Sequence, residues 1–265
     1  MSASHSTKWD SGDLYESYAG RWSRLVARTF LEWLGQPFER DWLDVGCGTG
    51  ALIEAILAVC EPRAVTGVDP SAEYIDFAMA HIADERVRCK VGDAQTMPVD
   101  TASVDAVVSG LVLNFIPNPT TASAEMRRVA RPGGVVAAYV WDYAGKMELM
   151  RYFWDAAVEL NPNSADRDQG RRFPICTPPR LAALFASVGL TEVETIAIDV
   201  PTVFRDFDDY WSPFLSGQGG APGYTVSLNE AERAALRELL RRRLPIRPDG
   251  SIHMVARAWA VKARA

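Results

Sequence analysis

The sequence predicts an α/β fold in which a mostly parallel sheet is covered by helices on both faces. Strand-like and helix-like segments alternate regularly between residues 42 and 141, which is typical of βαβ units. Three of the strand-like segments are almost wholly apolar, as expected where both faces of a sheet are covered. The first of these segments runs directly into a glycine-rich turn, "VGCGTG", and then into an expected helix.

The N-terminal half supplies most of the expected sheet. A helix is expected over 14–35, because apolar residues recur at helical spacing and Gly35 is a good stop signal. Pro70 is suited to the first turn of a helix that follows the second strand. The other elements expected here are strands at 42–45, 64–69, 86–94, 104–113 and 135–141, and helices at 51–59 and 121–130.

After Asp142 the alternation breaks, which predicts helical additions to the sheet. The expected elements are helices at 147–160, 180–190 and 229–244, irregular chain at 161–179, and closing strands at 193–200 and 251–261. We therefore expect a single domain over 1–265 with a helical cap inserted after the fifth strand. Its expected parts are an N-terminal helical segment at 1–40, a core at 41–142, and cap segments at 143–190 and 201–250.

Composition narrows the class of protein. The chain is 48% hydrophobic and 23% charged, and its net charge of −6 argues against a nucleic-acid partner. The four cysteines form no C-x-x-C pair and no metal-like spacing with the three histidines, so we expect reduced thiols and no metal site. Neither a signal peptide nor an apolar run long enough for a membrane span is present, and a cytoplasmic location is expected. The oligomeric state stays open.

The glycine turn is the first candidate for a binding site. Gly46, Gly48 and Gly50 follow the first strand, and ligands of open parallel sheets bind beyond the carboxyl ends of the strands. Backbone without side chains lets a ligand lie directly on the loop, although tight strand-to-helix turns also use glycine without any ligand. The spacing differs from the G-x-G-x-x-G of dinucleotide binders. Asp44, just before the turn, suits a ligand with a positively charged end.

A second acid extends this candidate site. Asp69 closes the second strand, 19 residues past Gly50, and a carboxylate there can accept both ribose hydroxyls of a nucleoside. The alternative is that Asp69 caps the helix that follows Pro70. The two roles do not exclude each other.

Four motifs occur in a familiar order: "LDVGCGTG", "VTGVDPS", "VGDAQTMPVDTASVDAVVSGLVLNFIPN" and "VARPGGVVAAYVW". With these motifs, residues 15–142 resemble class I S-adenosylmethionine-dependent methyltransferases. The similarity is strongest to the small-molecule subgroup related to the C-methyltransferases of ubiquinone and menaquinone biosynthesis. The resemblance implies a Rossmann-like sheet of seven strands with the last strand antiparallel. It also implies S-adenosyl-L-methionine as cofactor and S-adenosyl-L-homocysteine as product.

The resemblance further implies roles for single residues. The three glycines would face the methionine and ribose parts of the cofactor, Asp44 would hold its ammonium end, and Asp69, with Pro70 beside it, would bind the ribose. The remaining cofactor contacts that it implies are Asp93 to the adenine amino group, the backbone of Ala94 beside the ring, Ser109, Gly110 and Leu111 near the sulfonium, and Arg21 with Tyr15 near the carboxylate.

The acceptor is less defined by the sequence. Methyl transfer mainly requires alignment of a nucleophile with a carbon that the sulfonium already activates, so no catalytic dyad is needed. The catalytic residues are unknown, and the candidates near the strand ends are Asp142, Tyr143 and Asn114. The aromatic residues between 143 and 224 predict an aromatic or lipophilic small molecule. A cofactor-binding module without turnover, an aminopropyl-type transferase and, less favoured by the glycine spacing, an NAD-dependent dehydrogenase stay open.

Overall fold

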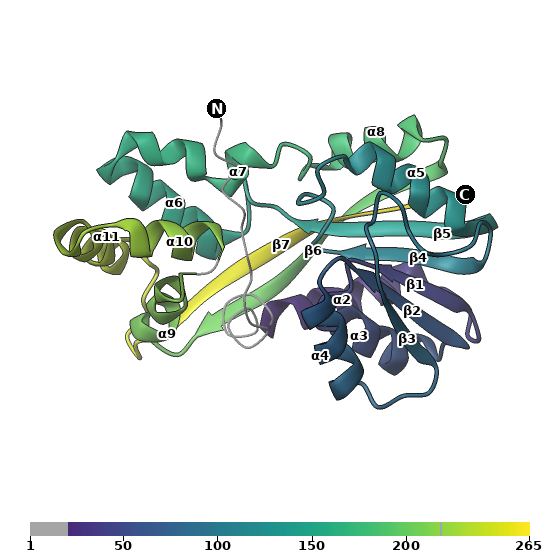
Figure 1. Cartoon of the computed structure of the whole chain (residues 1–265). Helices are drawn as coiled ribbons and strands as arrows, with labels where there is room; N and C mark the ends of the chain where they lie inside the picture. The colour runs from purple at the N-terminus through teal and green to yellow at the C-terminus, as the bar shows by residue number, and fades with distance from the viewer. Residues whose placement is uncertain (1–20, 218) are drawn as a thin grey trace. The chain divides into compact units, whose positions relative to one another are not determined.

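A seven-stranded sheet dominates the computed structural model, which describes residues 21–217 and 219–265 (Figure 1). Its strand order is β3-β2-β1-β4-β5-β7-β6. Strands β1 to β5 pair in parallel, whereas β7 runs antiparallel to β5. The predicted seven-stranded sheet with an antiparallel last strand is therefore confirmed. The strands are β1 Asp41–Val45, β2 Ala64–Asp69, β3 Val87–Val91, β4 Val104–Gly110, β5 Ala130–Trp141, β6 Thr191–Phe204 and β7 Ile252–Arg264.

The helices alternate with the strands up to β5 and then accumulate in the second half of the chain. They are α2 Arg21–Leu34, α3 Ala51–Cys60, α4 Ala72–His81, α5 Pro119–Val129, α6 Glu148–Leu160, α7 Gln169–Arg172, α8 Pro178–Ser187, α9 Phe207–Trp211, α10 Gly220–Ser227 and α11 Glu230–Arg243. Two short 3₁₀ helices, η2 Pro162–Arg167 and η3 Ser212–Leu215, lie among them.

The described chain forms two compact units. The larger one comprises 23–141, 175–198 and 258–265, and it holds strands β1 to β5. Its helices α3 and α4 lie against β2 and β3 on one face, while α5 and α8 pack together on the other face (Figure 1). The central strands are buried on both faces, with Leu43, Val107 and Val136 fully enclosed. The apolar runs in the sequence therefore correspond to doubly covered parallel strands.

The second unit contains 142–174 and 199–257 and has an aromatic core. The ring of Phe153 stacks on Phe214 with centroids 4.5 Å apart, and Trp154 and Tyr224 close the cluster at 5.6 Å. The hydroxyl of Tyr210 donates to the carbonyl of Leu149 at 3.0 Å. All of these rings are buried. Most aromatic side chains of this segment therefore hold its helices together instead of lining an open pocket.

Several predicted boundaries were wrong for local reasons. Strand β4 ends at Gly110 and not at 113, because Leu111 adopts a left-handed backbone with φ of 62°. Strand β5 begins at Ala130, so the "RPGG" segment lies inside it, next to an irregular pairing between Val104 and Ala106. The segment predicted to be irregular at 161–179, and the segment at 205–228 for which no element was predicted, contain short helices. Helices of four to eight residues present too few turns for periodicity to be recognised.

Helix α4 starts later than predicted. Its N-cap is Ser71, whose side chain accepts from the backbone N–H of Tyr74 at 3.3 Å. Pro70 therefore precedes the cap and does not occupy the first turn. The expectation that Asp69 could be the cap was also wrong. Its carboxylate accepts instead from backbone N–H groups of loop residues.

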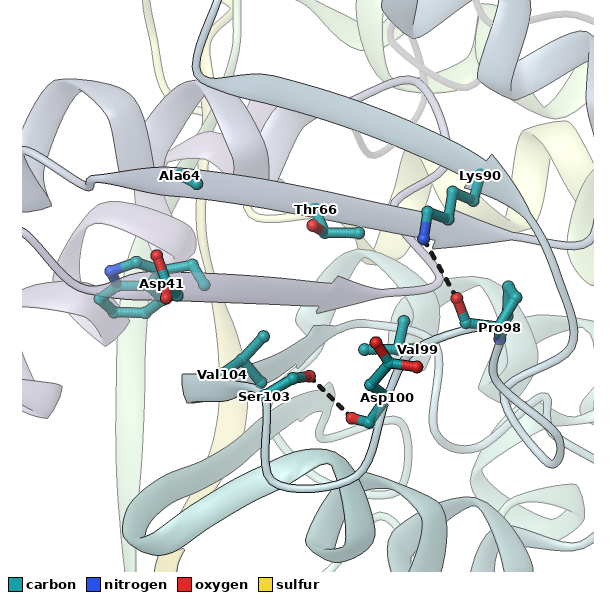
Figure 2. Close-up of a pocket in the computed structure, with 10 residues that line it drawn as sticks. Asp41, Ala64, Thr66, Lys90, Pro98, Val99, Asp100, Ser103 and Val104 are labelled. Carbon is teal, nitrogen blue, oxygen red and sulfur yellow. Dashed lines mark hydrogen bonds between the residues drawn. The ribbon is translucent and has the colours of Figure 1, made fainter.

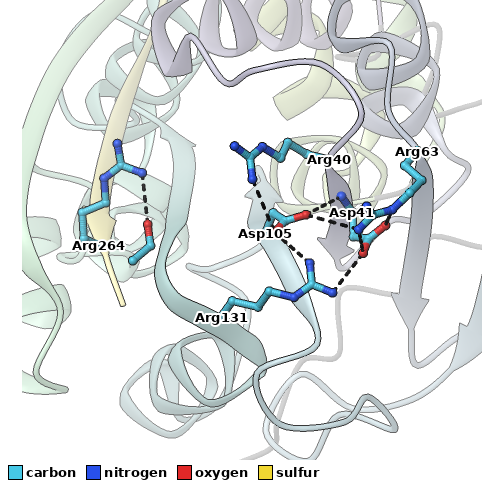
Figure 3. A network of polar contacts seen from close by, with 7 residues as sticks. Arg40, Asp41, Arg63, Asp105, Arg131 and Arg264 are labelled. Atoms are coloured by element: carbon cyan, nitrogen blue, oxygen red, sulfur yellow. Dashed lines mark hydrogen bonds and ion pairs between the residues drawn. The ribbon is translucent and has the colours of Figure 1, made fainter.

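Charged side chains gather at the amino ends of β1 and β4 (Figure 3). Asp41 accepts from Arg63 Nε at 2.7 Å, Asp105 pairs with Arg131 at 2.7 Å, and Arg40 lies 3.7 Å from Asp105. The hydrogen bond from Arg63 lowers the pKa of Asp41. These acidic and basic side chains pair with one another, so we assign this end of the sheet a structural role.

Candidate cofactor-binding site

The glycine turn lies at the carboxyl end of β1 and has left-handed backbone at all three glycines. The φ angles are 75° at Gly46, 51° at Gly48 and 94° at Gly50. A Cβ at Gly46 would lie 2.5 Å from Val112, and one at Gly50 would lie 2.4 Å from Ile82. At Gly48 such an atom would meet nothing within 4 Å. Packing therefore requires the outer two glycines, while the middle one bares its backbone to open space.

Asp69 is held by the backbone on both sides. One carboxylate oxygen accepts from the N–H of Gly48 at 3.0 Å, and the other accepts from the N–H of Ser71 at 2.9 Å. Burial raises the pKa of Asp69, although these two hydrogen bonds act in the opposite direction. The acid is thereby fixed next to the bare middle glycine, with further lone pairs able to accept from a ligand.

Asp44 is the most unusual side chain of the core. It is only 1% exposed, and neither carboxylate oxygen accepts a hydrogen bond from any residue that the structure describes. Burial raises its pKa well above the ordinary value, and the nearby charge of Asp69 raises it further. A buried carboxylate without a partner is costly, so the position calls for a cationic or hydrogen-bonding group from a ligand.

The end of β4 joins this site from the neighbouring strand. Ser109 is fully buried, and its hydroxyl donates to the carbonyl of Val45 at 2.8 Å, which ties the ends of β1 and β4 together. A Cβ at Gly110 would lie 2.6 Å from the hydroxyl oxygen of Tyr139. Leu111, in its left-handed conformation, donates its N–H to the Tyr139 carbonyl at 2.8 Å. Such backbone strain persists only where the surroundings enforce it.

The loop after β4 also buries an unpaired amide. Both polar side-chain atoms of Asn114 are buried and have no hydrogen-bond partner among the described residues. On the other side of the site, Asp93 is exposed and accepts from the N–H of Gln95 at 2.8 Å, while Ala94 is buried.

Other predicted site residues lie outside this group. Asp142 and Tyr143 belong to the second unit, where Asp142 accepts from the N–H of Lys146 at 2.8 Å and the ring of Tyr143 packs on Phe173. Arg21 begins α2, but its side chain is not among those described. Tyr15 lies outside the described residues.

Sequence reasoning missed two residues that shape the glycine turn. Val112 packs onto Gly46, but it lies in an apolar run that resembled a strand and gave no distinguishing signal. Gly67 interrupts the buried strand β2, and a Cβ there would collide with Cys47, Ile53 and Cys89. A glycine inside a strand often marks such a close approach, and this signal was available.

Known proteins can be compared with this geometry. Residues 43–138 match the family described as "Methyltransferase domain". A malonyl-[acyl-carrier protein] O-methyltransferase of Hahella chejuensis is 35% identical over 45% of this chain and 43% of its own length. The human thiol S-methyltransferase TMT1A is 31% identical over 55% of this chain and 60% of its own length. A demethylmenaquinone methyltransferase of Desulfitobacterium hafniense is 29% identical over 57% of this chain and 65% of its own length.

Residues 43–138 therefore carry a methyltransferase domain. The whole chain spans less than two thirds of the length of each of these curated relatives.

Solved structures share the methyltransferase fold. A phosphoethanolamine N-methyltransferase 2 of Haemonchus contortus, in complex with S-adenosylhomocysteine, has a TM-score of 0.60 and 15% identity, covering 95% of this chain and 56% of that one. The [4+2]-cyclase SpnF has a TM-score of 0.54 and 17% identity, covering 93% of this chain and 81% of that one. In the described part of the chain, no helix is long and apolar enough to cross a membrane.

The described residues at this site fit S-adenosylmethionine, the cofactor that the resemblance in sequence implies. The orphaned carboxylate of Asp44 matches a group carrying an ammonium, and the open space beside Gly48 gives access to bare backbone. Asp69 is fixed next to this backbone by its bond to Gly48. A ligand with a cationic end and free hydroxyls requires two acceptors of this kind. The unpartnered acid can pair with the cationic end, and the acid beside the open loop can accept from the hydroxyls.

A separate cavity of about 240 Å³ lies on the face of β1, β2 and β3 (Figure 2). Thr66 and Lys90 line it, and the ammonium of Lys90 donates to the carbonyl of Pro98 at 3.2 Å. None of the predicted cofactor contacts lines this cavity. It is therefore distinct from the candidate cofactor-binding site.

Proposed function

We propose that this protein transfers a methyl group from S-adenosylmethionine to a small-molecule acceptor. The observation that carries the proposal is the buried, unpartnered carboxylate of Asp44 at the end of β1, beside a turn whose middle glycine faces open space. A tight turn that served only the fold would give no reason to bury a lone carboxylate next to it.

Each residue has a definite task in this proposal. Asp44 binds the ammonium of the cofactor, Asp69 accepts from its ribose hydroxyls, and the backbone at Gly48 lies against it. Ser109 holds the ends of β1 and β4 in place through its bond to Val45, so that Gly110 and Leu111 border the same site. When bound, the cofactor supplies an activated methyl carbon, and the protein contributes alignment of the acceptor and exclusion of water.

The acceptor is proposed to be a small molecule with aromatic or lipophilic character. Curated relatives named as O-, S- and menaquinone methyltransferases support a small acceptor. We propose that 1–265 works as one methyltransferase unit, in which the core at 41–142 binds the cofactor and the cap segments at 143–190 and 201–250 select the acceptor. The four free cysteines support a reducing compartment such as the cytoplasm.

Replacing Asp69 by alanine is expected to weaken S-adenosylmethionine binding by about 10- to 100-fold, because hydrogen bonds to a charged group contribute about 1.5–3 kcal/mol each. Isothermal titration calorimetry with the cofactor measures this loss. Circular dichroism of the same variant should show an intact fold, since among the described residues the carboxylate accepts hydrogen bonds from two loop N–H groups.

Ser71→Ala is the matched control, two residues along the chain. It removes the N-cap of α4 and should cost about 1 kcal/mol of stability while leaving the affinity for the cofactor unchanged. If Asp69→Ala binds the cofactor as tightly as the wild type, Asp69 has only a structural role and the proposed site is wrong.

A cofactor-binding protein without methyl transfer is the second candidate. The [4+2]-cyclase SpnF has the same fold, so the fold alone does not require methyl transfer. Incubation with S-adenosylmethionine and a panel of phenols, thiols and quinols distinguishes the two. Formation of S-adenosylhomocysteine with any of them supports the enzyme, whereas tight binding without product across the panel favours the second candidate.

A further inference from the structure

Two cysteines from distant parts of the sequence meet beneath the glycine turn. Cys47 lies between Gly46 and Gly48, and Cys89 lies in β3, on the far side of β2. The point where a Cβ of Gly67 would lie is 2.8 Å from the sulfur of Cys47 and 3.0 Å from that of Cys89. Both sulfurs therefore face the same small space beside Gly67. The missing side chain at Gly67 thus provides the room in which both sulfurs sit.

The two thiols differ in environment. Cys47 is buried, and its pKa is raised because its thiol donates to Cys89 and because burial disfavours the thiolate; the nearby Asp44 adds to this effect. Cys89 is half-buried, and its pKa is lowered chiefly because it accepts the hydrogen bond from Cys47. Cys89 is the more exposed of the two and its thiolate is the more favoured, so Cys89 is the nucleophile of the pair.

We propose that Cys47 and Cys89 form a peroxide-sensitive thiol pair, and that their oxidation to a disulfide weakens binding of the cofactor at the glycine turn. The thiolate of Cys89 attacks one oxygen of hydrogen peroxide, the O–O bond breaks, and a sulfenic acid forms as hydroxide leaves and takes up a proton. The thiol of Cys47 then attacks the sulfenic sulfur, the S–O bond breaks, and its proton leaves with the oxygen as water. Two thiols lose two electrons in total, and one peroxide becomes two waters.

The bond would disturb the turn because its sulfurs must come closer. A disulfide holds its sulfurs about 2.05 Å apart, closer than two unbonded sulfurs can approach, so its formation draws Cys47 toward Cys89 in β3. Gly46 on one side is packed against Val112, and Gly48 on the other side donates to Asp69. A shift of Cys47 therefore pulls on the N–H of Gly48 that fixes Asp69. This effect on affinity rests on the proposed function, whereas formation of the disulfide does not.

Peptide mapping of the full-length protein tests the disulfide. The reduced protein is treated with hydrogen peroxide, free thiols are alkylated, and the unreduced digest is analysed by mass spectrometry. We expect a peptide that links Cys47 to Cys89 and that disappears on treatment with dithiothreitol. Recovery of both cysteines as alkylated thiols or as sulfinic acids, without a cross-link, would overturn the proposal. This result would be independent of whether the protein binds the cofactor.

Calorimetry with S-adenosylmethionine tests the consequence. Oxidation should raise the dissociation constant by about tenfold, the effect of losing one hydrogen bond to a charged group, and dithiothreitol should restore it. Cys89→Ala should show no response to peroxide, whereas Cys60→Ser, which removes a buried thiol of α3, should respond like the wild type. A cross-link that leaves the affinity unchanged, or an equal loss in Cys89→Ala, would contradict control of the turn by this pair.

Discussion

Asp44→Asn is expected to make the ligand-free protein more stable and its binding of S-adenosylmethionine weaker. The carboxylate is buried without a partner among the described residues, so removing its charge should raise the free energy of unfolding by about 1–3 kcal/mol. The same change removes the charge that would pair with the cofactor ammonium, and the affinity should fall by about 10- to 100-fold. Chemical denaturation measures the gain in stability, and calorimetry measures the loss of affinity.

The stability difference should depend on pH in a defined direction. The pKa of Asp44 is raised in the folded protein, so the folded state binds the proton more tightly than the unfolded state. Its contribution to stability is therefore full below the ordinary pKa of 3.8 and is lost as the pH rises through the higher folded pKa. The advantage of Asp44→Asn should accordingly grow as the pH increases from about 4.

Asp41→Asn is the matched control on the same strand. The hydrogen bond from Arg63 lowers the pKa of Asp41, so this carboxylate contributes stability above its ordinary pKa and loses that contribution as the pH falls. The variant should be less stable than the wild type at neutral pH, with unchanged affinity for the cofactor. If Asp44→Asn destabilises the protein as Asp41→Asn does, Asp44 has a structural partner and the proposed cofactor contact is wrong.

The sheet could be predicted from the sequence because most of its strands are short, continuous and strongly apolar runs of residues. The glycine turn and Asp69 could also be placed, since each ends a buried strand and such ends meet at one edge of a parallel sheet. The burial of Asp44 without a partner could not be predicted, because it depends on the absence of hydrogen-bond donors on the strands that pack around it. The approach of Cys47 and Cys89 to the same space beside Gly67 joins residues on either side of β2, and only the strand order reveals it.

The aromatic segment shows the opposite case. Its residue types suggested a pocket for an acceptor, but Phe153, Phe214 and Tyr210 are buried against one another. Composition alone does not distinguish a core from a binding site, because both favour large rings. The missed helices α9 and α10 belong to this same segment, where packing and not periodicity determines the backbone.

Gly46 and Gly48 of the turn should respond differently to alanine. Gly46→Ala combines left-handed backbone with a Cβ only 2.5 Å from Val112, and it should cost about 2–5 kcal/mol of stability from strain and overpacking. Gly48→Ala meets no neighbour within 4 Å and should cost only the backbone term of about 1–2 kcal/mol. Thermal and chemical denaturation compare the two variants.

The affinity for the cofactor should not follow the loss of stability, because the variant that folds well is expected to bind poorly. A methyl group at Gly48 would occupy the open space in which the cofactor backbone contact is proposed, so Gly48→Ala should lose about tenfold or more in affinity despite its mild effect on folding. Gly133→Ala separates the two causes, because Gly133 has a φ of 76°, also meets nothing within 4 Å, and lies in β5 away from the turn. It should show the same loss of stability with unchanged affinity. Equal affinity in Gly48→Ala and Gly133→Ala would mean that the space beside Gly48 is not where the cofactor binds.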